Sequence, residues 1–205
     1  MGCFVEILKK LFLLALFAAF MWLGGWKLMK EQYNSYVNPA RDVFVESQKS
    51  YADFTKVPEN FQLSRCVNLA GYKKVYAKYL PTGQKIYIYD LKTDTKITES
   101  DFDTNAIKEK IVFIPNVFKE AAANLDGIQV TGKGRYKAQN KSVPFVLFSA
   151  RVKNVPLREV KGVLAAYSSV DSKTKKTTNK VIITVVEKSE YNPFIVSSFV
   201  NALRF

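Results

Sequence analysis

The sequence predicts an α+β fold in which a single N-terminal transmembrane helix precedes one domain, an antiparallel sheet of consecutive hairpins packed against helices. An uncharged apolar run lies near the N-terminus, apolar and polar residues alternate over much of the remaining chain, and three stretches carry helix signals. We divide the chain into a head and anchor over 1–28, a juxtamembrane helical segment over 29–57 and an α+β domain over 58–205.

The anchor prediction depends on the run Leu11–Trp26, which contains no charged residue. As a helix it would be roughly 24 Å long, somewhat less than the ~30 Å hydrocarbon core of a bilayer. Flanking lysines can extend toward the headgroups, and tryptophan is typical of the membrane interface. We therefore predict a single-pass signal-anchor. The residues expected at its two interfaces are Lys9, Lys10, Trp22, Trp26 and Lys27.

A cleaved secretory signal is the alternative interpretation of this run. Such a signal ends at small residues in an A-x-A-like pattern, whereas the nearest candidate site here has Leu23 and Gly25, followed by Trp26. The uncleaved anchor is therefore favoured. Because the head is short and basic, we expect the N-terminus in the cytoplasm and the C-terminal domain to be extracytoplasmic.

Composition restricts the chemistry of the protein. The chain of 205 residues has a formal net charge of +13, which favours an anionic partner. It contains no histidine, which excludes His-based acid–base catalysis and Ser-His-Asp or Cys-His nucleophile arrangements. Cys3 and Cys66 lie on either side of the predicted anchor, so no disulfide within the chain is expected.

The domain is expected to contain three hairpins, because alternating runs flank turn residues such as Pro81-Thr82-Gly83. A further strand is predicted over 61–69. The paired runs are 72–80 with 84–91, 128–136 with 143–153, and 162–170 with 180–187.

Helix signals occur at three places. The segment after the anchor is broken at Asn38-Pro39, and we predict a helix from Pro39 to about Lys56. Residues 116–125 form another candidate helix, capped by Asn116. Asn192-Pro193 begins a C-terminal helix.

Three short motifs resemble functional sites, but their contexts favour structural roles. Gly132-Lys133-Gly134-Arg135 lacks the spacing and the following helix of a phosphate-binding loop, so its glycines indicate a strand bulge. Asp101-Phe102-Asp103 offers two carboxylates without further ligands for a cation. Ser172–Lys175 matches S-x-x-K within a polar loop. No catalytic residue, metal ligand or cofactor is therefore predicted.

Basic residues interleaved with aromatic ones are the remaining signal. Alternate residues of a strand share a face. Lys74 and Lys78 therefore lie on one face of their predicted strand, and Lys133, Arg135 and Lys137 lie on one face of theirs. If the two strands were neighbours, these five cations would form one surface for an anionic ligand. The other interpretation is a solvated sheet face.

The function expected from these observations is a membrane-anchored binding module of the cell envelope. Its basic domain would recognise an anionic polymer, a lipid headgroup or a protein partner. Nucleic acid is not expected, because the domain is placed outside the cell. The alternative is a membrane-anchored enzyme that uses carboxylates or lysine rather than histidine, which a water-shielded pocket with two convergent acids would favour.

Overall fold

A computed structural model describes Leu14, Ala18, Trp22 and residues 25–49, 51–66, 74–91, 125–139, 141–153, 159–170 and 177–205. The chain divides into two compact units, Met1–Ala40 and Arg41–Phe205. The described regular element of the first unit is helix α2 (Trp26–Val37), which ends where Asn38-Pro39 interrupts the helical pattern.

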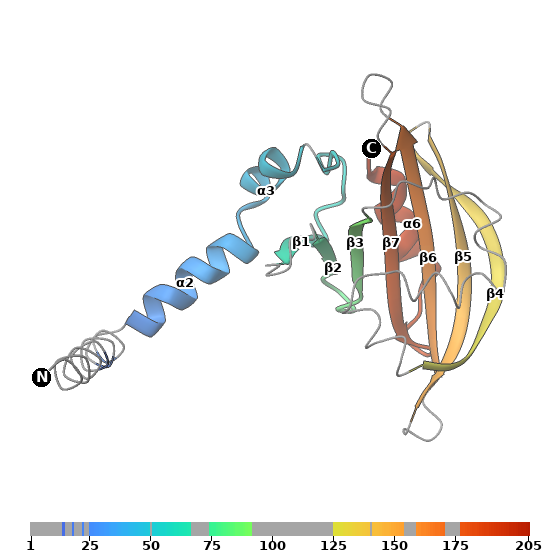
Figure 1. The fold of residues 1–205 in the computed structure, drawn as a ribbon, viewed down its shortest axis with the longest axis horizontal. Coiled ribbons are helices and arrows are strands. Elements are labelled where there is room, and N and C mark those ends of the chain that lie inside the picture. The colour runs from blue at the N-terminus through green and yellow to red at the C-terminus, as the bar shows by residue number, and fades with distance from the viewer. Residues whose placement is uncertain are drawn as a thin grey trace, which may run out of the picture. The chain divides into compact units, whose positions relative to one another are not determined.

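The second unit is built on a seven-stranded antiparallel sheet with the order β1-β2-β3-β7-β6-β5-β4 (Figure 1). Its strands are β1 (Phe61–Cys66), β2 (Lys74–Tyr79), β3 (Lys85–Leu91), β4 (Leu125–Ala138), β5 (Lys141–Val152), β6 (Glu159–Val170) and β7 (Thr177–Glu187).

The three predicted hairpins are confirmed as β2–β3, β4–β5 and β6–β7, and the predicted strand over 61–69 is found as β1. The order of the hairpins in the sheet was not predicted. Strand β3 pairs with β7 rather than with β4, so the last four strands are added in reverse order and β4 forms the far edge. Local alternation specifies which face of a strand is apolar, but it contains no information about which strands become neighbours.

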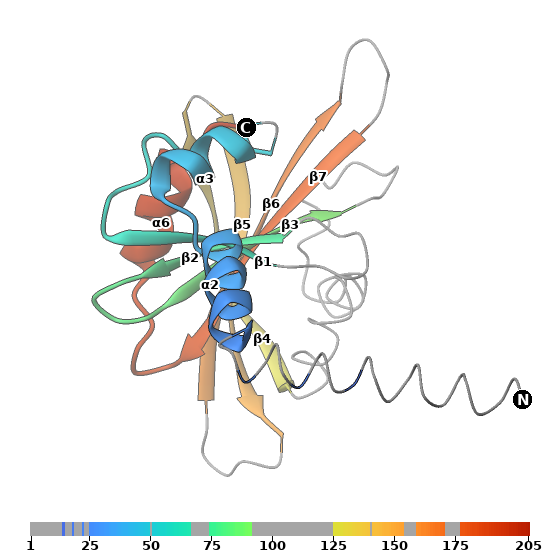
Figure 2. The same ribbon diagram turned by 90° about the vertical axis from the view of Figure 1, so that its left-hand side faces the viewer.

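Two short helices belong to the sheet unit, and Figure 2 shows both on the same side of the sheet. Helix α3 (Arg41–Gln48) is shorter than the predicted helix to Lys56, because residues 51–57 instead form turns that pack on the sheet. Helix α6 (Pro193–Ala202) begins as predicted. The Asn192 side chain accepts a hydrogen bond from the Phe194 amide, and Pro193 occupies the first turn. The predicted helix over 116–125 lies outside the described residues apart from Leu125, which begins β4.

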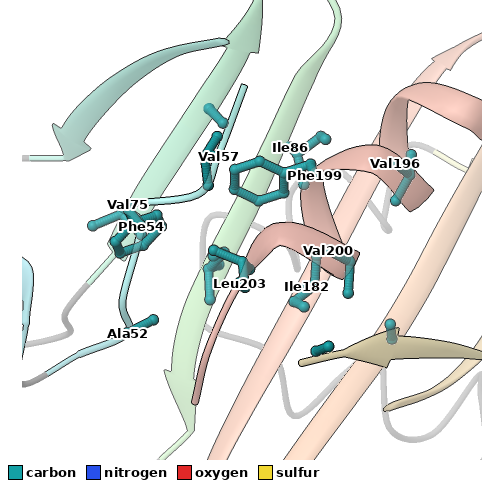
Figure 3. Close-up of a cluster of buried hydrophobic side chains, with 14 of the residues drawn as sticks. Ala52, Phe54, Val57, Val75, Ile86, Ile182, Val196, Phe199, Val200 and Leu203 are labelled. Carbon is teal, nitrogen blue, oxygen red and sulfur yellow. The ribbon is translucent and has the colours of Figure 1, made fainter. Parts of the chain in front are cut away.

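The main hydrophobic core lies between the sheet and α6, together with α3 and the turns that follow it. Figure 3 shows Phe199 of α6 and Leu203, which follows α6, next to Ile86 of β3, Ile182 of β7 and Val57. All five are almost completely buried. We call this side of the sheet the helix face. On the opposite face a second buried cluster is centred on β5, β6 and β7.

The structure overturns the predicted fold class. In the part of the chain that it describes, no helix is long and apolar enough to cross a membrane. Helix α2 has 12 residues, of which half are polar, and 12 residues span about 18 Å, well below the ~30 Å of a bilayer core. The predicted transmembrane helix, signal-anchor and single-pass location with an extracytoplasmic domain are therefore wrong. The fold is mostly one antiparallel sheet with three short helices among the described residues, rather than an anchored α+β domain.

Candidate functional site

Three of the five predicted ligand-binding cations lie together on the edge strand β4. Lys133, Arg135 and Lys137 occupy alternate positions, are all exposed, and lie on the face opposite the helices. Their cross-strand partners on β5 are uncharged. The Arg135 guanidinium donates a hydrogen bond to the Ser142 hydroxyl over 3.1 Å, which orients it along the strand pair. We call Lys133, Arg135 and Lys137 the β4 cationic row.

The other two predicted cations, Lys74 and Lys78, lie on β2, at the opposite side of the sheet. Strands β3, β7, β6 and β5 separate β2 from β4, which corresponds to about 24 Å at ~4.8 Å per strand. Electrostatic fields in solution are screened over about 8 Å at physiological ionic strength. The structure therefore places the five cations in two separate groups and does not join them into one surface.

The group on β2 is mixed with tyrosines. Lys78 pairs across the hairpin with the exposed Lys85, whose ammonium lies 5.8 Å from the ring centroid of Tyr76. The Tyr76 ring lies 5.7 Å from that of Tyr87 on β3. Tyr76, Lys78 and Tyr87 are half-buried, and Lys85 contacts an aromatic ring as well as solvent.

The glycines of Gly132-Lys133-Gly134-Arg135 have a structural cause, as the strand interpretation predicts. The register of β4 on β5 shifts between Val130 and Gly132, which marks a bulge. A side chain at Gly134 would come within 2.6 Å of the Phe145 ring, so the aromatic side chain of β5 needs a glycine there. The glycines allow this packing and expose the two cations on the other face.

The remaining predicted residues do not form a described site. Lys9 and Lys10, Asp101-Phe102-Asp103 and Ser172–Lys175 lie outside the described residues. The side chains of Trp22, Trp26 and Lys27 are exposed in the first unit.

The sheet also contains a cavity of about 550 Å³ that no sequence pattern identified. We call it the end cavity, because it is formed where β4 begins, β5 ends and β6 begins, together with Lys188, which follows the last residue of β7 (strands labelled in Figure 1). Most of the residues that line it are polar. The side chains that shape it are Gln129, Thr131, Ser149, Arg151, Glu159 and Lys161.

Charges of both signs lie around the end cavity. The Lys188 ammonium donates to the Glu159 carboxylate over 2.5 Å, and the Lys188 amide donates to the Glu159 carbonyl over 3.0 Å. Hydrogen bonding and charge from Lys188, with smaller contributions from Arg151 and Lys161, lower the pKa of the Glu159 carboxyl. Glu159 is therefore an anion at neutral pH and is unsuited to act as a general acid, which needs a raised pKa.

Besides Glu159, a buried lysine bears on the alternative that the protein is an enzyme using carboxylates or lysine. Lys180 of β7 lies with its ammonium 3.5 Å from Asp90 Oδ1 and 3.9 Å from the ring centroid of Tyr51, and it donates a hydrogen bond to the Tyr51 carbonyl. These groups enclose the ammonium from three sides, and Lys180 does not line the end cavity. A reacting lysine must be reached by its substrate, so the contacts indicate a stabilising role.

The sequence contains one signal that points to the end cavity. On the helix face of β5 the apolar residues Val143, Phe145 and Leu147 are followed by Ser149 and Arg151, which continue the same alternation with polar side chains. Polar residues at core-facing positions mark a place where the core ends and solvent or a ligand begins. Their convergence with β4 and β6 becomes visible only when the register is known.

In comparisons with known proteins, no protein-family model and no curated protein matches this chain.

Proposed function

We propose that this protein is a binding module that recognises an anionic polymer through the β4 cationic row. The row consists of three exposed cations at alternate positions of one edge strand. Alternate residues of a strand are about 7 Å apart, so the cations are evenly spaced along a line. A linear array of this kind suits a partner whose negative charges repeat along a chain.

The charge of the whole protein supports this proposal. With a net charge of +13, the chain attracts polyanions at long range before any specific contact forms. At the row itself, the cross-strand neighbours on β5 are uncharged. The predicted location outside the cell was the argument against nucleic acid as a partner. The structure contradicts that location, so nucleic acid belongs among the polymers to be tested.

The experiment compares two triple variants with the same total charge. One replaces Lys133, Arg135 and Lys137 with glutamine, and the matched control replaces the exposed Lys49, Lys56 and Lys153. Binding to polyphosphate and to duplex DNA is measured by fluorescence anisotropy at low salt. We expect the row variant to lose most of its affinity and the control to lose little.

Vesicles of phosphatidylserine and phosphatidylcholine separate a polymer from a lipid surface as the partner. Tight binding to these vesicles, together with weak binding to both polymers, would replace the polymer proposal with a headgroup surface. Equal losses in the two triple variants would mean that overall charge, rather than the β4 cationic row, attracts the polyanion.

A further inference from the structure

Four side chains at the end cavity have no bonding partner among the described residues. Within the described ranges, Gln129, Ser149, Arg151 and Lys161 make no side-chain hydrogen bond and no ion pair. Ser149 and Lys161 are half-buried, so they have lost part of their hydration without a replacement contact. Gln129 and Arg151 are exposed. Polar groups that line a cavity and have no partner in the protein are available to a ligand that enters it.

The strand register brings these groups together. Ser149 of β5 pairs with Gln129 of β4 on one side and with Lys161 of β6 on the other, so their side chains form a row across three strands of the helix face. Arg151 lies two residues beyond Ser149 on the same face. An ammonium, a guanidinium, a hydroxyl and an amide thus converge on one cavity.

The cavity is lined by three cations, Arg151, Lys161 and Lys188, and two carboxylates, Asp126 and Glu159, which leaves one positive charge in excess. Glu159 faces Arg151 across β5 and β6, but its carboxylate is held by Lys188. Asp126 faces Arg151 from β4, and its Oδ1 accepts a hydrogen bond from the Gly127 amide over 2.9 Å. Arg151 and Lys161 make no ion pair to either carboxylate, so an anion entering the cavity would find both cations available.

We propose that the end cavity binds a small organic anion with one carboxylate or phosphate group. Lys161 and Arg151 hold the acid group, and Ser149 and Gln129 bind hydroxyl or amide groups of the body of the ligand. A cavity of about 550 Å³ is of the size that takes such a molecule. The site is independent of the β4 cationic row, because the two lie on opposite faces of the sheet.

The test uses the full chain with glycerate, which has one carboxylate, glycerol 3-phosphate, which has one phosphate, and uncharged glycerol as probes. Titration calorimetry gives the affinity, and amide chemical shifts locate the site in the wild-type protein. We expect one or both anions to bind saturably and to shift the amides around Ser149, Arg151 and Lys161, whereas glycerol does neither. The anion that binds more tightly identifies the acid group.

Single variants then test the named cations. Lys161→Gln and Arg151→Gln should each weaken anion binding about tenfold or more, the usual effect of losing a charged hydrogen bond. Lys56→Gln, with the same loss of charge at a distant exposed position, should stay within about twofold. The β4 row variant should also keep its affinity for the small anion, so failure of one proposal is distinguishable from failure of the other.

Three results would overturn the proposal. The first is that neither anion binds the wild-type protein. The second is that the shifted amides lie away from the end cavity, a measurement that needs no variant to fold. The third is that Lys161→Gln and Arg151→Gln both bind as tightly as wild type.

Discussion

Lys180 on β7 lies directly across from Asp90 on β3, with Nζ 3.5 Å from Oδ1, at the seam where the two halves of the sheet meet. The Lys180 side chain is 8% exposed and that of Asp90 is 25% exposed. The same ammonium contacts the carbonyl and the ring of Tyr51, which precedes the turns packed on the helix face. One side chain therefore connects β3, β7 and the segment after α3.

Replacing Lys180 with methionine should lower the free energy of unfolding by about 2–3 kcal/mol. Removing one partner of a buried ion pair costs ~3–5 kcal/mol, and partial exposure of Asp90 to water reduces that cost. Urea denaturation measures the change. Lys188→Met is the matched control, because its ion pair with Glu159 is 57% and 42% exposed and should contribute much less. Equal effects of the two substitutions would contradict this account of the seam.

The raised pKa values of the Tyr136 and Tyr191 hydroxyls predict that the folded protein loses stability in alkali. Burial raises the pKa of both hydroxyls, and for Tyr136 the nearby Tyr191 raises it further. The unfolded chain ionises tyrosine near pH 10, whereas the folded protein keeps these groups neutral to higher pH. Their contribution to stability is complete below about pH 10 and is lost as the pH rises from there toward the raised folded-state pKa.

Tyr136→Phe should therefore make the alkaline decline shallower. Each buried tyrosine contributes at most about 1.4 kcal/mol per pH unit to that slope, and phenylalanine contributes none. The measurement is the free energy of unfolding in urea between pH 9 and pH 12. Tyr33→Phe, at an exposed position of α2, is the control and should follow the wild type. A slope unchanged by Tyr136→Phe would show that other groups dominate the alkaline transition.

Gly162 on β6 should tolerate no side chain. A methyl group there would lie 2.5 Å from both Phe148 Cζ and the Thr184 carbonyl oxygen, and the latter belongs to the backbone of β7. We expect Gly162→Ala to cost about 2–3 kcal/mol, as overpacking of a core does.

Gly132→Ala provides the comparison for Gly162→Ala. Its nearest neighbour would be Leu147 Cδ1 at 3.3 Å, the end of a flexible side chain, so its cost should be below about 1 kcal/mol. Thermal melts of the two variants measure the difference. A larger loss in Gly132→Ala than in Gly162→Ala would contradict the packing described for β5–β7.

The sequence predicted those parts of the fold that depend on neighbouring residues. Turn residues and alternation located three hairpins, and Asn192-Pro193 located the start of α6. The strand order could not be predicted, because the pairing of β3 with β7 joins residues about a hundred positions apart. The anchor prediction was based on an uncharged run shorter than the roughly 20 residues that a spanning helix needs, with flanking lysines and tryptophans expected to make up the difference.

In the candidate sites, too, the features that depend on neighbouring residues could be predicted, and those that depend on strand order could not. Alternation correctly placed Lys133, Arg135 and Lys137 on one face of one strand. The expectation that Lys74 and Lys78 would lie beside them required β2 and β4 to be neighbours, which the strand order prevents. The end cavity draws its residues from three strands and the turn after a fourth, so it exists only through non-local register.

The salt dependence of polyanion binding tests the central claim most directly. For duplex DNA, each phosphate contact contributes about 0.9 to the slope of log K against log salt concentration. If the β4 cationic row makes these contacts, replacing Lys133, Arg135 and Lys137 with glutamine should reduce the magnitude of the slope by about 3, while replacing Lys49, Lys56 and Lys153 leaves it nearly unchanged. The same slope for the wild-type protein and the row variant would contradict the account.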